Sequence, residues 1–304
     1  MKPYSSYQCL KGTPMTDRDV KEQGSKFWNE GKWENFIKPF LPDGKDLNFV
    51  DMGCNAGLFL KLAEDMGFKA LGVDFDKDAV DRGEVWRDSN GGKYDFYRLA
   101  LNESIEKLPL SDYTVLANSH YYFTINDFLD YLDKLKFKTR YCIVVTDEKR
   151  HLNRCWASAN VEDIRRFYRE WEEVGFIDLI DPTGDPSPRK LRSLCFKSKF
   201  LEKVPVDSLD SSNHVQDGFY SELDKGTEYK KTRYYRIMKP YRKNWSEKRL
   251  NNWFQERVDL YQSVKKEGVK TPLIVDNDDK ILDGNHRYSM LKSLGNKDIF
   301  IRRV

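Results

Sequence analysis

Short apolar runs alternate with segments of helical spacing in the first two thirds of the chain. Residues 47–52 form an apolar run that ends in an acid, and residues 58–66 carry apolar side chains at helical intervals before Gly67. Residues 70–76 are a second apolar run that again ends in acids. Glycine commonly ends a helix because it tolerates a positive φ. The alternation therefore predicts a parallel sheet whose strands are joined by crossover helices.

The last third of the chain has a different order of elements. The pattern predicts a helix at 250–264 that ends at Gly268, strands at 271–276 and 281–282, a helix that opens at 283–287 and runs through 294, and a strand at 299–302. Short strands mixed with helices are typical of an α+β arrangement. We therefore expect a second, smaller α+β domain after the α/β domain.

Composition excludes several classes of protein. Hydrophobic residues make up 39% and aromatic residues 14% of the 304 residues, which is too much for a disordered chain. No apolar run approaches the about 18 residues of a membrane-spanning helix. The five cysteines are scattered without a Cys-x-x-Cys pair, so we expect no metal site and no disulfide scaffold. Residues 1–6 show no apolar segment of a signal peptide, and we expect a cytoplasmic protein.

Charge is unevenly shared along the chain. Residues 206–304 contain 20 Lys and Arg against 15 Asp and Glu, whereas residues 1–205 have a small excess of acids. The stretch 204–213 is rich in turn-forming residues, which is typical of a connection between domains. From this pattern and the two resemblances described below, we predict an N-terminal extension at 1–23, an α/β domain at 24–205, a linker at 206–235 and a second domain at 236–304.

The turn after the first predicted strand is suited to binding a ligand. Gly53 and Gly57 let the backbone approach a ligand closely, and the following helix directs its first N–H groups toward it. Asp51 can accept a hydrogen bond from an ammonium group, and Asp74, at the end of the next strand, from ribose hydroxyls. The spacing Gly-x-x-x-Gly lacks a glycine of the dinucleotide fingerprint, which disfavours NAD. An ordinary strand–turn–helix connection is the alternative.

Two segments carry a family resemblance. Residues 50–57, Val-Asp-Met-Gly-Cys-Asn-Ala-Gly, and residues 72–76, Gly-Val-Asp-Phe-Asp, resemble motif I and the following acidic motif of class I S-adenosylmethionine-dependent methyltransferases. The resemblance covers about residues 24–200 and implies a Rossmann-like sheet with S-adenosyl-L-methionine as cofactor. The sequence departs from the family at Asn55, a usual glycine, and at Asn102, a usual acid that contacts the adenine amino group. Neither departure removes the glycines of the turn.

The resemblance also implies the remaining elements and the cofactor site. It implies strands at 93–101, 113–119, 141–146, 175–180 and 194–197, and a helix around 161–174. The implied cofactor-binding residues are Asp51, Gly53, Cys54, Asn55, Gly57, Asp74, Phe75, Asn102 and Asn118.

A base is needed when the methyl acceptor must lose a proton, whereas a phosphate or carboxylate oxygen needs none. His120 follows the fourth implied strand, whose end opens onto the expected cleft, and is the candidate catalytic base. Its alternative role is to cap its helix or to pack on Tyr121 and Tyr122. Trp28 and Trp33 either cover the cofactor or belong to the core.

The sequence disfavours two classes of methyl acceptor. Residues 118–122 read Asn-Ser-His-Tyr-Tyr, without the prolines of the Asn/Asp-Pro-Pro-Tyr run typical of enzymes that methylate amino groups of DNA. Asn118 either binds substrate or merely ends a strand. The chain has no Pro-Cys nucleophile of a cytosine-C5 enzyme. A small molecule or a glycan therefore remains as substrate, with O-methylation favoured.

A second resemblance lies near the end of the chain. The strand at 271–276, the run Asp-Gly-Asn-His-Arg at 283–287 and the following Leu-Gly resemble the ParB/sulfiredoxin-like superfamily. The match covers about residues 236–304 and implies a nucleotide- or phosphate-binding site, with ATP or another nucleotide and Mg²⁺ as cofactors. The implied binding residues are Asp283, Gly284, His286 and Arg287. Asn285 replaces the cysteine of sulfiredoxins, so we do not expect reductase activity.

Residues 225–249 contain ten Lys or Arg and five aromatic residues. This composition suits a nucleic acid, a glycan groove or a solvated surface. With a net charge of only +3 for the chain, nucleic acid is kept as an alternative partner but is not favoured. The sequence thus predicts a methyltransferase with a nucleotide- or phosphate-binding domain. The alternatives are a bifunctional kinase/methyltransferase that modifies a phosphorylated acceptor, and a ParB-like nucleic-acid-binding protein with a non-catalytic first domain.

Overall fold

The computed structural model describes residues 30–147, 161–180, 190–210 and 214–304. The chain divides into two compact units, residues 1–199 and residues 200–304. No helix in these described ranges combines the length and the apolar character needed to cross a bilayer.

The first unit is built on a seven-stranded sheet with the order β3-β2-β1-β4-β5-β7-β6. The strands are β1 (Asn48–Met52), β2 (Lys69–Asp74), β3 (Asp95–Arg98), β4 (Ser111–Ala117), β5 (Thr139–Asp147), β6 (Glu172–Ile180) and β7 (Lys190–Lys197). The first five strands are parallel, and β7 runs antiparallel to both β5 and β6. This is the Rossmann-like sheet that the sequence predicts, and the expected fold class is confirmed.

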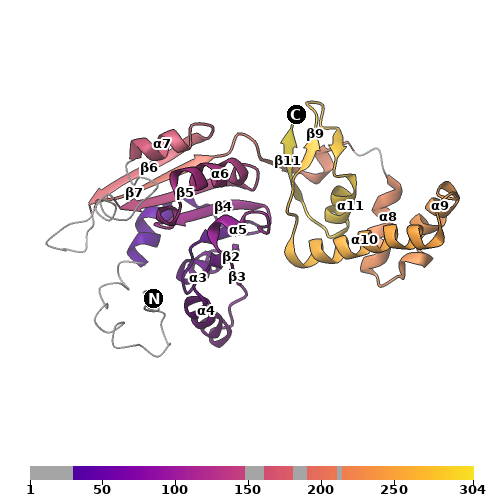
Figure 1. The fold of residues 1–304 in the computed structure, drawn as a ribbon, viewed down its shortest axis with the longest axis horizontal. Coiled ribbons are helices and arrows are strands. Elements are labelled where there is room, and N and C mark those ends of the chain that lie inside the picture. Colours follow the sequence, from indigo (N-terminus) through magenta and orange to yellow (C-terminus); the bar gives the residue numbers. More distant parts are fainter. Residues whose placement is uncertain (1–29, 148–160, 181–189, 211–213) are drawn as a thin grey trace. The chain divides into compact units, whose positions relative to one another are not determined.

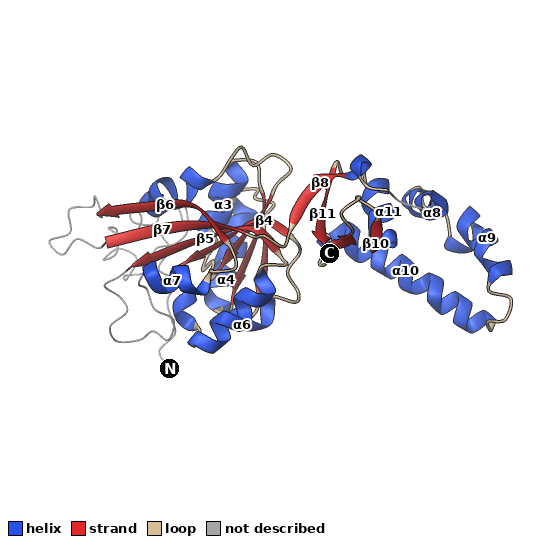
Figure 2. Cartoon of the chain, turned by 90° about the horizontal axis from the view of Figure 1, so that it is seen from above, coloured by secondary structure: helices blue, strands red, loops and turns tan. Residues whose placement is uncertain are grey.

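Helices cover both faces of this sheet (Figures 1 and 2). One face packs against η1 (Trp33–Ile37), α3 (Leu58–Asp65) and α4 (Lys77–Ser89), and the other against α5 (Leu101–Ser104), α6 (Ile125–Leu135) and α7 (Val161–Phe167). Successive residues of a strand point to opposite faces, so Phe49 enters the first core and Val50 the second. Strands covered on both faces are apolar along their whole length, which explains the continuous apolar runs of the sequence.

Two elements differ from the sequence prediction. The expected helix at 161–174 ends earlier, because β6 begins at Glu172 and pairs there with Lys197 of β7. Tyr168 and Trp171 between the helix and the strand are buried, and the Tyr168 ring stacks on Phe196 at 4.2 Å between centroids. The expected strand at 93–101 is confined to β3, because α5 already begins at Leu101. Tertiary pairing overrides helical propensity in the first case.

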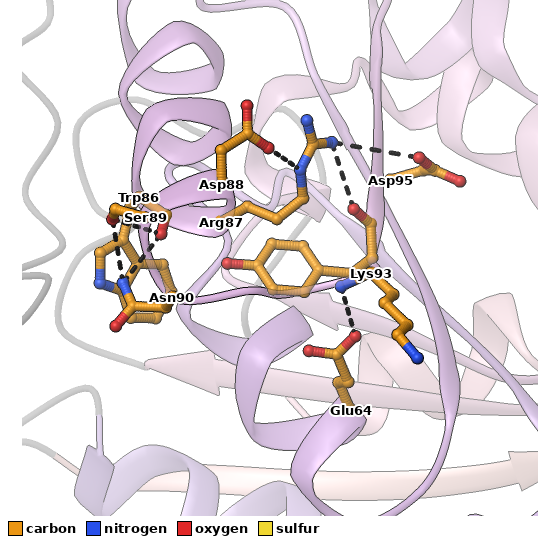
Figure 3. A network of polar contacts seen from close by, with 9 residues as sticks. Glu64, Trp86, Arg87, Asp88, Ser89, Asn90, Lys93 and Asp95 are labelled. Carbon is orange, nitrogen blue, oxygen red and sulfur yellow. Dashed lines mark hydrogen bonds and ion pairs between the residues drawn. The ribbon is translucent and has the colours of Figure 1, made fainter.

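A network of polar contacts closes the connection between α4 and β3 (Figure 3). The Arg87 guanidinium donates to the Asp88 carboxylate at 2.8 Å and to the Tyr94 carbonyl at 3.3 Å. The Lys93 N–H donates to the carboxylate of Glu64 on α3 at 2.6 Å. The network holds the amino end of β3. Because β1, β2 and β3 are parallel, it lies at the opposite sheet edge from the turn that follows β1.

The second unit is an α+β fold, as expected. Its sheet has the order β10-β9-β11-β8, with β9 parallel to β11 and the outer two strands antiparallel to their neighbours. The strands are β8 (Glu202–Pro205), β9 (Leu273–Val275), β10 (Ile281–Asp283) and β11 (Asp298–Arg303), and the helices are α8 (His214–Asp224), α9 (Arg233–Tyr241), α10 (Glu247–Glu267) and α11 (Asn285–Ser293). The resemblance to the ParB/sulfiredoxin-like superfamily stays a prediction.

Residues 206–235, for which we predicted a linker, belong to the second unit. Phe219 and Tyr220 of α8 are buried against Phe254 and Tyr261 of α10. The strand β8, which we placed in the first domain, pairs with β11 along its whole length. Burial of aromatic side chains and strand pairing thus shift the boundary to about residue 200.

Candidate functional site

The turn that joins β1 to α3 requires its two glycines. Gly53 and Gly57 have φ values of +80° and +82°. A Cβ atom on Gly53 would lie 2.7 Å from the Cβ atom of Ser119, and one on Gly57 would lie 2.6 Å from the Phe96 ring. Neither distance is compatible with a side chain, so the close approach of neighbouring segments selects glycine at both places. Asn55 between them also has a positive φ, +51°.

This turn is tied to the end of β2. One carboxylate oxygen of Asp74 accepts the Asn55 N–H at 2.7 Å, and the other accepts the Asp76 N–H at 3.0 Å. Burial raises the pKa of the Asp74 carboxyl, and the two hydrogen bonds from Asp76 and Asn55 oppose that rise. Each carboxylate oxygen can accept more than one hydrogen bond, so Asp74 retains capacity for a hydroxyl ligand.

Asp51 is a buried carboxyl with an unused acceptor. Its Oδ2 atom is enclosed and has no hydrogen-bond partner within the described residues. Burial raises the pKa of Asp51 to about 8, the charge of Asp74 adds to the rise, and the charge of Lys32 opposes it. The ionised form of such a buried carboxyl is stabilised most by a cationic ligand, because the cation replaces the interaction that water no longer provides.

Lys32 is a residue of the site that the sequence analysis missed. It is buried just before η1, and its charge acts on Asp51. The Asn118 amide, oriented so that both its atoms are satisfied, donates to the Val145 carbonyl at 3.2 Å and accepts from Lys32 Nζ at 3.0 Å. Lys32 precedes the first strand in a segment without a motif, and only the folding of η1 against the sheet brings it to Asp51.

Two exposed aromatic rings lie at the same edge of the sheet. Phe75, directly after Asp74, is 56% exposed, and Tyr122 of η3 (His120–Tyr122) is 60% exposed. Their ring centroids are 6.3 Å apart in an edge-to-face arrangement. Contact between an apolar ring and water is unfavourable, and a flat ligand ring that packs on these side chains would remove it. A pair of exposed rings beside buried carboxylates therefore suits a ligand with a flat ring.

Three further residues that we predicted to bind the cofactor lie in different surroundings: one beneath the turn, one after β4 and one on α5. Cys54 is fully buried beneath the turn, where a Cβ atom on Gly72 would lie 2.5 Å from its sulfur, and burial raises the pKa of its thiol. Asn118 follows β4 with φ +61°, beside Lys32. Asn102 is exposed in the first turn of α5, after β3. Cys54 thus supports the turn from inside.

The structure favours the packing interpretation of His120. Its ring is fully buried, 4.1 Å from the Tyr121 ring and 6.1 Å from the Phe128 ring between centroids. A base must reach the proton that it removes, and a covered imidazole does not meet that condition in this conformation. Trp33 also belongs to the core, where it contacts Phe49 at 5.9 Å, and Trp28 lies outside the described residues.

The predicted phosphate-binding residues of the second unit have internal partners. Gly284 opens α11 with φ +100°, and a Cβ atom there would lie 2.5 Å from Leu273. The Arg287 guanidinium donates to the Pro272 carbonyl at 2.7 Å, to the Thr271 carbonyl at 2.9 Å and to the exposed Asp283 carboxylate at 2.8 Å. These contacts join the residues just before β9 to the last residue of β10. Phosphate binding through Arg287 stays a prediction and would have to compete with them.

His286 faces the helices of its own unit. Its Nδ1 atom lies 2.7 Å from the Tyr220 hydroxyl, and its Nε2 atom accepts from Arg257 Nε at 3.3 Å. Burial, together with the charge of Arg257, lowers the pKa of His286 to about 4. The imidazole is therefore neutral near pH 7 and connects α11 to α8 and α10. In the part of the chain that the structure describes, no cluster of His, Cys, Asp and Glu is suited to a metal ion.

Comparisons with known proteins concern the fold. No family model matches the sequence, and no curated protein matches it. The PH0226 protein from Pyrococcus horikoshii OT3 has a similar structure, with 13% identity over 64% of this chain and 95% of that chain (TM-score 0.46). Magnesium protoporphyrin IX methyltransferase from Synechocystis PCC 6803 with bound SAM has 13% identity over 62% and 87% (TM-score 0.44).

The bifunctional kinase-methyltransferase WbdD is also similar, with 15% identity over 72% of this chain and 58% of that chain (TM-score 0.41). At these identities and scores the comparisons assign neither an activity nor a substrate to this chain. The assignment of a function therefore rests on the geometry of the site.

Proposed function

We propose that the first unit binds S-adenosyl-L-methionine at the ends of β1 and β2 and that the protein is an S-adenosylmethionine-dependent methyltransferase. The observation that carries this proposal is the buried Oδ2 atom of Asp51, which has no hydrogen-bond partner among the described residues and belongs to the strand that leads into the turn at Gly53. It fits the α-ammonium group of the cofactor. Lys32, whose charge already acts on Asp51, suits the neighbouring carboxylate group.

The other residues of the edge fit the remaining parts of the same molecule. Asp74 has acceptor capacity for the ribose hydroxyls, and Phe75 with Tyr122 offers exposed rings for the adenine. When bound, the cofactor supplies an electrophilic methyl group, and the protein supplies position and electrostatics. The chain thus has candidate binding residues for the ammonium group, the ribose and the adenine of the cofactor.

The position of His120 bears on the acceptor. Because its ring is covered by Tyr121 and Phe128, we propose an acceptor oxygen that needs no deprotonation, such as a carboxylate or a phosphate, on a small molecule or a glycan. This retains the expected O-methylation and defines the chemistry of the oxygen. Incubation with labelled cofactor and panels of acids, phosphorylated sugars and neutral alcohols tests it, and methylation confined to neutral hydroxyls would contradict it.

Calorimetric titration of the full chain with S-adenosylhomocysteine tests the cofactor site. We expect saturable heat for the native chain and none for Gly53→Val, because the added side chain would overlap Ser119. Gly91→Val is the matched control: Gly91 also has a positive φ, +66°, but no atom of the described residues lies within 4 Å of the place that its Cβ atom would take. Equal loss in both variants, or no heat with the native chain, would contradict the proposal.

A further inference from the structure

A basic hollow lies between helices α9 and α10 of the second unit. The two helices are joined by residues 242–246 (Figures 1 and 2). The hollow has a volume of about 630 Å³. Its charged lining consists of five cations and one acid: Lys230, Arg236, Lys239, Arg242, Lys243 and Glu247. A concave surface dominated by one sign of charge concentrates counter-ions, here anions.

Among the residues that the structure describes, no carboxylate forms an ion pair with these cations. Within the described residues, Lys230, Arg236, Lys239 and Lys243 form no ion pair with a carboxylate, although nearby Lys231 pairs with Glu228 at 3.4 Å. The Nε atom of Arg242 is enclosed and has no acceptor among the described residues. A buried donor without an acceptor is costly, so an anionic ligand that reaches Arg242 would relieve that cost.

A second hollow shares Trp245 with the first. It has a volume of about 420 Å³ and is also lined by Lys248, Arg249 and Trp253. The guanidinium groups of Arg242 and Arg249 lie 4.6 Å and 4.3 Å from the Trp245 ring centroid. Stacking on the indole holds both guanidinium groups in place while their charge stays available. The two hollows thus share Trp245 as a lining residue. We call the two together the α9–α10 groove.

Tyr241 adds an exposed ring next to the hollow: it lines neither hollow itself but stands in the sequence between the lining residues Pro240 and Arg242. It is 81% exposed at the end of α9. The other aromatic residues of α9, Tyr234 and Tyr235, are buried in the core of the unit, so α9 presents no apolar face to a lipid bilayer. A row of cations with an accessible ring is the arrangement that tracks a phosphate backbone and stacks its bases.

We propose that the α9–α10 groove binds single-stranded nucleic acid. The phosphates lie along Lys230, Arg236, Lys239 and Lys243, and one base stacks on Tyr241. The number of cations without an ion pair among the described residues and the exposed ring next to them in the sequence favour this ligand over a free phosphate or a lipid surface. The inference is independent of the cofactor site in the first unit.

Fluorescence anisotropy of the full chain with a labelled oligothymidylate of about twenty nucleotides, longer than one such groove covers, tests the proposal. We expect the variant Lys239→Gln/Lys243→Gln to weaken binding by about tenfold or more at low salt and to make the slope of log affinity against log salt shallower by about 1.4, which is two phosphate contacts. Tyr241→Ala should weaken binding by about tenfold without changing that slope, because stacking releases no counter-ions.

The control variant Lys280→Gln/Lys297→Gln removes the same charge from exposed positions of the same unit that do not line the groove. It should bind within about twofold of the native chain. Equal weakening by the two double variants would overturn the proposal, because the affinity would then depend only on the net charge of the protein. Preference for anionic phosphatidylglycerol vesicles or for duplex DNA over the oligothymidylate would overturn it too. Thermal unfolding of each variant verifies that the fold is retained.

Discussion

The carboxylate of Asp74 accepts the backbone N–H of Asn55 at 2.7 Å, so the end of β2 holds the turn that follows β1. The two residues are 19 positions apart in the chain, and their contact connects the segments that we assign to the ammonium and the ribose of one ligand. The turn is therefore formed before a ligand arrives. A preformed site loses less conformational entropy on binding.

Removal of this carboxylate should affect both stability and binding. We expect Asp74→Ala to lower the free energy of unfolding by about 1–3 kcal/mol, because the buried N–H of Asn55 loses its acceptor, and to weaken S-adenosylhomocysteine binding by at least about tenfold. Urea denaturation and calorimetry measure the two effects. Asp95→Ala is the control: the exposed Asp95 carboxylate lies 4.0 Å from the Arg87 guanidinium, and its removal should change stability by less than about 0.5 kcal/mol.

The affinity for the cofactor should depend on pH through Asp51. In the ligand-free protein the raised pKa of this carboxyl keeps it protonated up to about pH 8. An ammonium ligand requires the ionised form, so the affinity for S-adenosylhomocysteine should rise by up to about tenfold per unit between about pH 6 and pH 8. In Asp51→Asn the affinity should be lower and almost independent of pH in this range. A flat profile for the native chain would contradict the assignment of Asp51.

The same group gives a stability prediction of opposite sign. Between about pH 4 and pH 8 the unfolded chain releases the Asp51 proton while the folded chain, in which the pKa is raised, retains it, so the free energy of unfolding should fall as pH rises. The contribution is at most ~1.4 kcal/mol per pH unit. Asp51→Asn should remove it and be the more stable protein at pH 8, as measured by urea denaturation at a series of pH values.

His120 and Tyr122 lie in the same short helix but should behave differently. His120→Ala should lower the free energy of unfolding by about 2–4 kcal/mol, because it leaves a cavity beside Tyr121 and Phe128. Tyr122→Ala should leave stability almost unchanged and weaken S-adenosylhomocysteine binding several-fold, because its ring is exposed beside Phe75. A stable His120→Ala variant without methyl transfer would instead support the role of catalytic base.

Acid should destabilise the second unit through His286. The pKa of this imidazole is about 4 in the folded chain, below its ordinary value of 6.5. Between these values the unfolded chain binds a proton that the folded chain does not, so stability should fall as pH falls from 6.5 to about 4. His286→Gln should show a shallower slope. Urea denaturation followed by tryptophan fluorescence measures it, and identical slopes would contradict the buried position.

Much of the fold was predictable from local patterns. The apolar runs that became β1 and β2, and the helix between them, appear in the sequence with nearly the observed bounds, because strands buried on both faces must be apolar throughout. The strand β8 and the helix α8 were missed or placed in a linker. Their stability comes from pairing with β11 and from packing on α10, contacts between residues distant in the chain.

The sequence by itself determined the turn of the candidate site. Gly53 and Gly57 are readable there because few other residues tolerate that backbone conformation, and Asp51 and Asp74 because strand ends of a parallel sheet share one edge. Only the tertiary structure decided which side chains remain available. The tertiary structure buried the His120 ring, used the Arg287 guanidinium in hydrogen bonds within the second unit and placed the charge of Lys32 near Asp51. Burial and charge at a site are sums over neighbours from the whole chain, which no local pattern contains.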